Sequence, residues 1–169
     1  MKAKLLLAAV LLSLVTFCQA QQNQKWEKWG WLLGAWKGEG SGKPGQGYGS
    51  FAFSFDLNNQ VIVRRNHTEF PDVQGKPVTA HDDLMIVYYD PAGGAAKAIY
   101  FDNEGHVINY TVSFIDKSIV LTSEKTGNTP AFRLTYTPLE KGDVDIVFDM
   151  SQDGTTFVTY LEGKSKRAR

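Results

Sequence analysis

The chain has 169 residues, and its 18 lysines and arginines balance 18 aspartates and glutamates. This balance excludes a general nucleic-acid binder, whose surface needs an excess of positive charge. The single cysteine, Cys18, excludes a disulfide framework and a cluster of thiolate metal ligands within the chain.

The first residues have the layout of a secretory signal peptide. Lys2 and Lys4 precede an apolar run over residues 5–17, and a small residue, Ala20, follows at the expected cleavage point. We therefore predict a signal peptide at 1–20, a single domain at 21–169, and a periplasmic or secreted protein. No lipid anchor at Cys18 is expected, because Phe17 stands where lipoprotein signals have a small residue. The apolar run is too short to span a membrane, and no later segment is apolar enough.

After the leader, apolar residues recur at helical spacing. Trp26, Trp29, Leu32 and Leu33 would share one face of a short amphipathic helix, which Gly34 is placed to end. We expect this segment to cover one end of the structure that follows.

Residues 34–40 form the first predicted strand. Gly34, Trp36, Gly38 and Gly40 share one face, so a single large ring stands among bare backbone. Such a face allows close approach of another element or leaves room for a ligand.

The rest of the chain alternates short β-rich runs with turn residues. Examples of the turns are Asn58-Asn59 and Asp153-Gly154. The predicted strands cover residues 47–57, 60–70, 82–90, 95–102, 106–114, 118–124, 131–137, 143–150 and 155–162. About ten consecutive antiparallel strands in one domain favour an all-β up-and-down barrel, because closure removes exposed edges. A β-sandwich is the alternative.

The stretch Gly34-Ala35-Trp36-Lys37-Gly38-Glu39-Gly40, after a short helix and before a run of antiparallel strands, resembles the calycins. This superfamily includes lipocalins, fatty-acid-binding proteins and nitrobindin-like barrels, and the pattern is most similar to uncharacterised exported bacterial members. The resemblance implies that Trp36 closes one barrel end and packs against a basic side chain of the last strand. Lys164, Lys166 and Arg167 are the candidates, and Arg167 is preferred. Nitrobindin-like proteins bind haem through a histidine near the C-terminus. The last histidine here is His106, so haem is not expected and the cofactor is unknown.

The predicted strand at 60–70 carries unusual charges. Arg65, His67 and Glu69 share one face, and Arg64 lies on the other with Ile62. Either face brings an arginine into the barrel, and the sequence leaves open which one. A buried guanidinium needs a carboxylate or several acceptors, so we expect an internal ion pair or a site for an anionic ligand group. The resemblance to fatty-acid-binding proteins favours the second.

Three histidines form a second set of candidates. His67 and His81 each lie two residues before a carboxylate on the same strand face, and His106 follows a predicted turn. Imidazole and carboxylate ligands would suit zinc or iron, with Glu69 or Glu104 as a base. The alternative is that the histidines lie at the barrel rim and bond to loops.

Tyrosines on the predicted strands suit either a core or a cavity lining. The candidate ligand contacts are Arg64, Arg65, His67, Tyr100, Tyr110 and Tyr136. No nucleophile elbow or phosphate-binding loop is present in the sequence, and no catalytic residue is assigned. The sequence therefore predicts a barrel that binds a small, partly apolar ligand. The alternatives are a metal-dependent enzyme and an envelope protein that binds a partner through a filled barrel. The oligomeric state is not predicted.

Overall fold

In the computed structural model of the protein, residues 25–39, 47–70, 79–125, 127 and 129–168 are described. The chain divides into two compact units, Met1–Trp31 and Leu32–Arg169. The predicted signal peptide lies outside the described residues. Within the described part, no helix has the length and apolar character needed to cross a bilayer.

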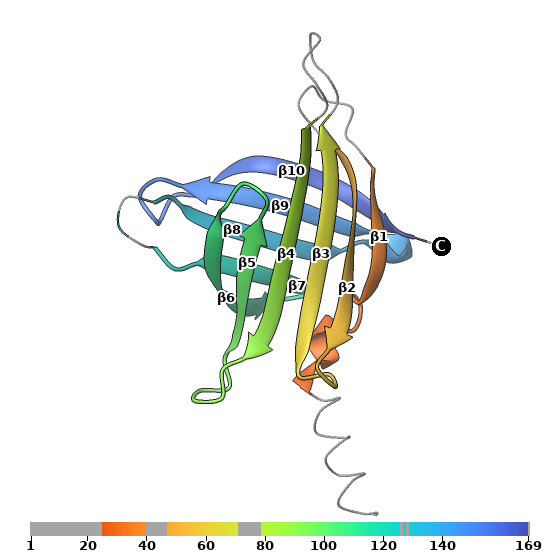
Figure 1. The fold of residues 1–169 in the computed structure, drawn as a ribbon, viewed down its shortest axis with the longest axis horizontal. Coiled ribbons are helices and arrows are strands. Elements are labelled where there is room, and N and C mark those ends of the chain that lie inside the picture. Colours follow the sequence, from red (N-terminus) through yellow and green to blue (C-terminus); the bar gives the residue numbers. More distant parts are fainter. Residues whose placement is uncertain (1–24, 40–46, 71–78, 126, 128, 169) are drawn as a thin grey trace, which may run out of the picture. The chain divides into compact units, whose positions relative to one another are not determined.

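The second unit consists of ten strands (Figure 1). Their bounds are β1 Gly34–Glu39, β2 Tyr48–Asp56, β3 Val61–Phe70, β4 Thr79–Tyr89, β5 Ala96–Asp102, β6 Val107–Ile115, β7 Ser118–Ser123, β8 Ala131–Pro138, β9 Val144–Ser151 and β10 Val158–Arg167. Each strand pairs antiparallel with its neighbours in sequence, and β1 also pairs with β10. The sheet is therefore closed, which confirms the predicted all-β antiparallel barrel and excludes the sandwich.

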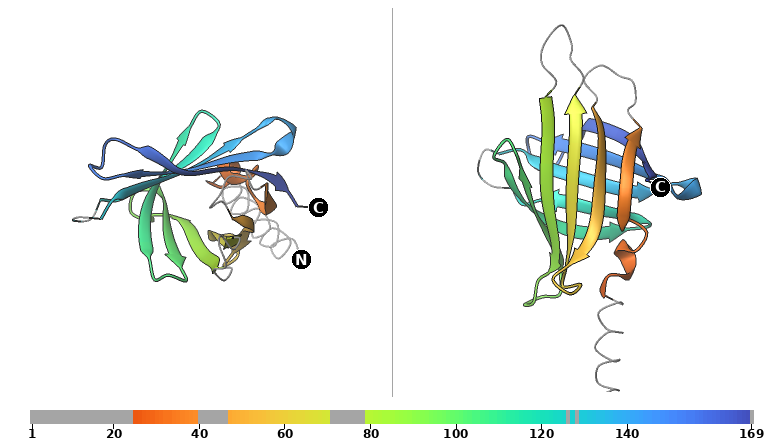
Figure 2. Two further views of the ribbon diagram at one scale, coloured as in Figure 1. Left: turned by 90° about the horizontal axis from the view of Figure 1, so that it is seen from above. Right: turned by 45° about the vertical axis from the view of Figure 1, so that its right-hand side comes forward.

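The interior of the barrel lies between two sets of strands. Figures 1 and 2 show β1–β4 crossing steeply over β7–β10, which form the opposite wall. Large side chains from both walls are fully buried between them, among them Trp36, Phe53, Met85, Leu121 and Tyr136. Their burial supplies the main stabilisation of the barrel, because the chain has no disulfide to add.

The turns have the backbone conformations that their residues predict. Asn58 and Asn59, between β2 and β3, have φ values of 54° and 63°. Gly105 and Gly154 also have positive φ, in the turns after β5 and β9. Asparagine and glycine tolerate this left-handed region, so these residues fix the positions of the hairpins.

The described residues before β1 do not form the predicted amphipathic helix. The first unit contains a 3-10 helix of three residues, Glu27–Trp29, closed by bonds from the Trp29 amide to the Trp26 carbonyl and from Gly30 to Glu27. A glycine within so short a segment disfavours a regular α-helix, and a single tight turn forms instead. The expectation that residues 26–33 close one barrel end stays a prediction.

The observed strands differ from the predicted ones in several places. β10 continues to Arg167, beyond the predicted end at residue 162, because its basic second half pairs with both β9 and β1. In β2, Phe51 and Phe53 are buried as their alternation predicts, but Phe55 is partly exposed and Leu57 lies in the turn.

Candidate functional site

Of the two neighbouring arginines of β3, Arg64 points into the barrel. It lies opposite Phe53 and Met85, both fully buried, and is itself buried, whereas Arg65 is exposed on the outer face. The Nη1 of Arg64 lies 2.5 Å from Oδ1 of Asp83 on β4. The inward arginine therefore forms the internal ion pair that was one of the two expected outcomes.

Asp83 also contacts two further polar side chains. Its side chain is only 4% exposed, and its Oδ2 accepts a hydrogen bond of 2.9 Å from the Nδ2 of Asn66 and lies 3.6 Å from Nε2 of His81. Burial raises the pKa of Asp83, and the positive charge of Arg64 opposes that rise. Removing either partner would leave an isolated charge in the interior.

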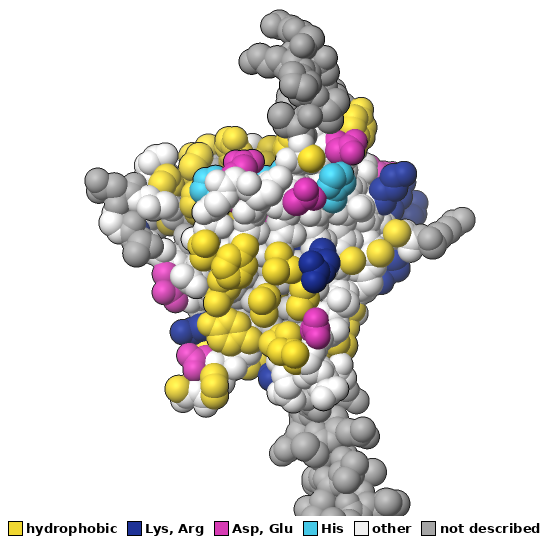
Figure 3. All heavy atoms as spheres, in the orientation of Figure 1, with side chains coloured by type: hydrophobic (Ala, Val, Ile, Leu, Met, Phe, Trp, Pro, Cys, Tyr) yellow, Lys and Arg dark blue, Asp and Glu magenta, His cyan; other side chains and the backbone are white. Residues whose placement is uncertain are grey.

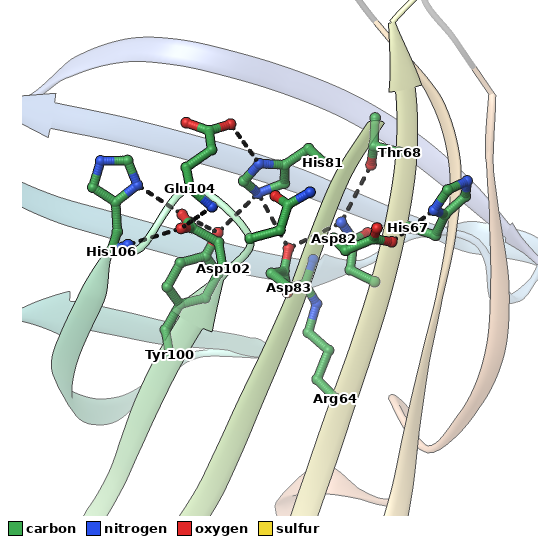
Figure 4. A network of polar contacts seen from close by, with 12 residues as sticks. Arg64, His67, Thr68, His81, Asp82, Asp83, Tyr100, Asp102, Glu104 and His106 are labelled. Atoms are coloured by element: carbon green, nitrogen blue, oxygen red, sulfur yellow. Dashed lines mark hydrogen bonds and ion pairs between the residues drawn. The ribbon is translucent and has the colours of Figure 1, made fainter. Parts of the chain in front are cut away.

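The network continues from Asp83 towards the barrel mouth (Figure 4). His81 Nε2 lies 2.9 Å from the Tyr100 hydroxyl, and His81 Nδ1 lies 3.1 Å from Oε1 of Glu104. The Tyr100 hydroxyl donates to Asp102 at 3.3 Å, and Asp102 lies 2.9 Å from Nδ1 of His106. A connected row of polar side chains therefore runs from the buried arginine to an exposed histidine.

The Tyr100 hydroxyl does not suit a nucleophile. Burial, together with Asp83 and Asp102, raises its pKa well above the ordinary value for tyrosine. It therefore stays protonated and acts as a hydrogen-bond donor.

Tyr110 and Tyr136 also point inward and are buried. Burial raises the pKa of Tyr136 to about 12, with Arg64 acting against the rise. Within the described part of the chain, the Tyr136 hydroxyl and the Nε of Arg64 have no hydrogen-bond partner. Two buried donors thus face the interior without an acceptor among the described residues.

The barrel wall formed by β8–β10 supplies apolar side chains that are partly exposed to solvent. Leu161 of β10 lies opposite Phe148 of β9, which lies opposite Leu134 of β8. Cross-strand neighbours share a sheet face, so these residues face the interior with the buried Leu134. Exposure rises along the row to 39% at Leu161. The ring of Phe148 stacks on Phe132 at a centroid distance of 5.6 Å.

The predicted histidine cluster does not form. His67 lies on the outer face, 2.7 Å from Asp82 and 3.3 Å from Glu69, whereas His81 belongs to the inner network. Among the described residues, no three histidine, cysteine or acidic side chains are arranged to hold a metal ion. His67 does lie beside Glu69, and His81 does lie beside Asp83, as their spacing predicts. The two pairs belong to separate networks.

At the junction of β1 and β10, Arg167 lies directly opposite Trp36. Its guanidinium carbon is 4.5 Å from the ring centroid of Trp36, and its Nη1 donates to the Leu33 carbonyl at 2.7 Å. The indole Nε1 of Trp36 donates to the Leu32 carbonyl at 2.8 Å. Of the other basic candidates, Lys166 pairs with Glu39 instead. The tryptophan and arginine thus join the first strand to the last.

Sequence reasoning missed Asn66 and Asp102 as members of the network. The predicted strand at 95–102 ends at Asp102, whose Oδ1 accepts hydrogen bonds from the backbone amides of Glu104 and His106. The sequence signal for its second role is its position two residues after Tyr100, which places both side chains on one strand face.

No protein-family model matches the chain, and no curated protein sequence matches it. A closed ten-stranded barrel does not by itself identify the calycins, since unrelated families share barrel architectures. Membership of the calycin superfamily therefore stays a prediction from residues 34–40.

Proposed function

We propose that the protein is a non-catalytic binding protein whose barrel holds a small, partly apolar molecule by a polar end near Arg64. The observation that carries this proposal is the pair of buried donors, Arg64 Nε and the Tyr136 hydroxyl, that lack an acceptor in the described residues. Native proteins satisfy nearly all buried polar groups, so exceptions of this kind need an explanation, and an acceptor on a bound molecule supplies one.

These two donors favour a ligand whose polar end carries an uncharged hydrogen-bond acceptor. Asp83 already balances the charge of Arg64, and a second carboxylate would add a repulsive charge in the interior. A carbonyl oxygen has two lone pairs and can accept from both Arg64 and Tyr136 without adding charge. The two residues are close enough for each to influence the other's pKa.

The remainder of the ligand would lie against the apolar wall of β8–β10. Phe132, Phe148 and Leu161 keep part of their surface accessible on the inner face, although burial would be favourable. Ligand sites in proteins typically combine such apolar walls with a few convergent polar groups.

A second candidate function is partner binding by a barrel whose interior is filled with side chains. The aromatic packing near β1 and β2 favours it. The Phe51 ring lies 6.1 Å from both Trp36 and Tyr136, and Phe53 lies 5.5 Å from Tyr136, measured between centroids. These rings fill that part of the interior, so an internal ligand would have to lie on the β8–β10 side.

Native mass spectrometry tests the proposal. The mature protein, purified without chelator from its own source, is measured before and after denaturation. We expect an organic molecule that is released on unfolding. Tyr136→Phe and Arg64→Lys should lower its occupancy, because each removes one donor, and Tyr48→Phe should not, because Tyr48 is exposed. A bare polypeptide mass would contradict the internal site and favour the filled barrel.

A further inference from the structure

Four glycines lie within the described strands, and three of them have a structural reason to lack a side chain. Gly34 of β1 has a φ of 109°, a conformation that residues with a side chain rarely adopt. A Cβ atom at Gly38 would lie 3.3 Å from the carbonyl oxygen of Gly49, and one at Gly49 would lie 2.5 Å from the carbonyl oxygen of His67. The backbones of β1, β2 and β3 approach so closely there that a side chain would force them apart.

Gly163 of β10 has neither of these reasons. Its φ lies outside the left-handed region. Apart from its two chain neighbours, no described residue has a heavy atom within 4 Å of a Cβ atom built on Gly163. A glycine inside a strand weakens the strand, because it loses more conformational freedom on folding and contributes no side chain to the packing. A close approach of a ligand to the backbone is a further reason for a strand glycine.

Gly163 faces the barrel interior at the level of Tyr136. It pairs with Ile146 of β9, which in turn pairs with Tyr136 of β8. Residues directly opposite each other share a sheet face, so the open space at Gly163 lies inside the barrel. Two strand spacings, roughly 10 Å, separate the backbones of Gly163 and Tyr136. The space is therefore near the Tyr136 hydroxyl, one of the two buried donors without an acceptor in the described residues.

The space beside Gly163 has apolar walls and a closed inner end. Leu161, two residues earlier on the same face, is 39% exposed. Ile146 and Phe148 of β9 are also partly exposed, although both lie on the inner face. In the other direction along β10, the next inward residue is Ser165, which is buried. The accessible space therefore runs inward past Leu161 and ends beyond Gly163.

We propose that Gly163 is the specificity-determining residue of the interior ligand site, and that it makes room for a ring of the ligand. The ligand is a cyclic carbonyl compound, a ketone, lactone or lactam, whose oxygen accepts from Arg64 and Tyr136. Its ring lies against the backbone of β10 at Gly163, and its apolar remainder extends over Leu161. This inference rests on the ligand site proposed above and adds the shape of the ligand's polar end.

A ring fits this arrangement better than an unbranched chain does. Leu161 and Phe148 project into the interior towards the mouth, whereas the missing side chain at Gly163 widens the space at the level of the donors. An unbranched chain has the same width along its length and would leave this added room empty. A ring next to the carbonyl fills the room and gains van der Waals contact with the peptide groups of β10.

Isothermal titration of refolded, ligand-free protein with two ketones of ten carbons tests the inference. The carbonyl of 2-decalone belongs to a fused ring system, and that of 2-decanone belongs to a chain. We expect the wild type to bind 2-decalone more tightly. Gly163→Val should weaken 2-decalone binding by about tenfold or more, because the new side chain occupies the room for the ring. It should change the affinity for 2-decanone much less. The urea midpoint of the ligand-free variant should not fall, since valine suits a strand and the position is open.

Lys164→Val is the matched control, because Lys164 is the next residue of β10 and is exposed on the outer face. Apolar probes can also bind the hydrophobic side chains that gather on the outer surface over β4 and β5 (Figure 3). Leu84→Ser removes an outer-face side chain of β4, opposite Phe101. Neither control should alter the affinity for 2-decalone.

The outcomes separate a failure of the inference from a failure of the interior site. If neither ketone binds, the site and the inference are both overturned. If both bind and Tyr136→Phe weakens both, the site stands. Equal affinities, tighter binding of 2-decanone, or an unchanged preference in Gly163→Val would then overturn the inference alone. A loss of ligand-free stability in both Gly163→Ala and Gly163→Val would also overturn it, because the glycine would then serve a bend of β10.

Discussion

Tyr136→Phe is the most informative single change in the barrel interior. Tyr136 is fully buried, and its ring lies against Phe51 and Phe53. The substitution keeps this ring packing and removes only the hydroxyl, which has no hydrogen-bond partner in the described residues. It therefore isolates the energetic effect of one buried polar atom.

The expected effect on the ligand-free protein is a gain in stability. A buried hydroxyl without a partner costs about 1–3 kcal/mol of desolvation. Removing it should raise the free energy of unfolding by about 1 kcal/mol or more. For a domain of this size, that raises Tm by about 2–4 °C. The same change should weaken ligand binding, so stability and affinity move in opposite directions.

Urea unfolding of protein that has been denatured, freed of bound molecules and refolded measures the first effect. The m-value should stay constant, because the surface exposed on unfolding is unchanged. Tyr48→Phe, at an exposed position, should leave the midpoint unaltered. Destabilisation of the ligand-free protein by Tyr136→Phe would refute the reasoning, since it would show that the hydroxyl already has a partner.

Three further predictions concern charged groups. Asp83→Asn should lower the free energy of unfolding by about 3 kcal/mol or more, measured in urea, because it leaves the buried charge of Arg64 uncompensated. His67 should titrate by NMR above its ordinary pKa of 6.5, because Asp82 and Glu69 accept hydrogen bonds from the imidazolium. Asp82→Asn should lower that pKa. Because the folded pKa is the higher one, this stabilisation is fully present below 6.5 and is lost as the pH rises through the folded value. Arg167→Ala should lower the free energy of unfolding by about 1 kcal/mol and speed amide exchange in β1, measured by mass spectrometry, because it removes a cation–π contact and a hydrogen bond between the end strands.

The order of strands was predictable because local signals agree with the final pairing. Alternating residues mark each strand, and residues such as Asn58 and Gly154 mark the turns with positive φ. The end of β10 was not predictable in this way. Lys164 and Lys166 lie beyond the predicted strand at 155–162, but their backbone lies in a strand because β1 pairs with it. Tertiary pairing overrides local preference here.

The choice between Arg64 and Arg65 depends on register. Alternation shows that the two face opposite ways, but a shift of one residue would exchange them. The pairing settles the matter by placing Arg64 opposite Phe53 and Met85, whereas Arg65 lies opposite Ala52. Register is a property of two strands together, so a single strand's sequence does not contain it.

Register also separates the histidines. Residues directly opposite each other in an antiparallel pair share a face. His67 lies opposite Asp82, and His81 lies opposite Thr68. His67 and His81 therefore point to opposite sides of the sheet, although spacing along the chain suggested a common cluster.

Strands β3 and β4 depart from the usual distribution of polar and apolar residues at a few positions. Arg64 and Asp83 point inward, while their neighbour Leu84 points outward. Buried charges and exposed apolar surface both reduce stability relative to the opposite arrangement, so folding alone does not account for the pattern. The ligand site proposed near Arg64 would account for the buried charges.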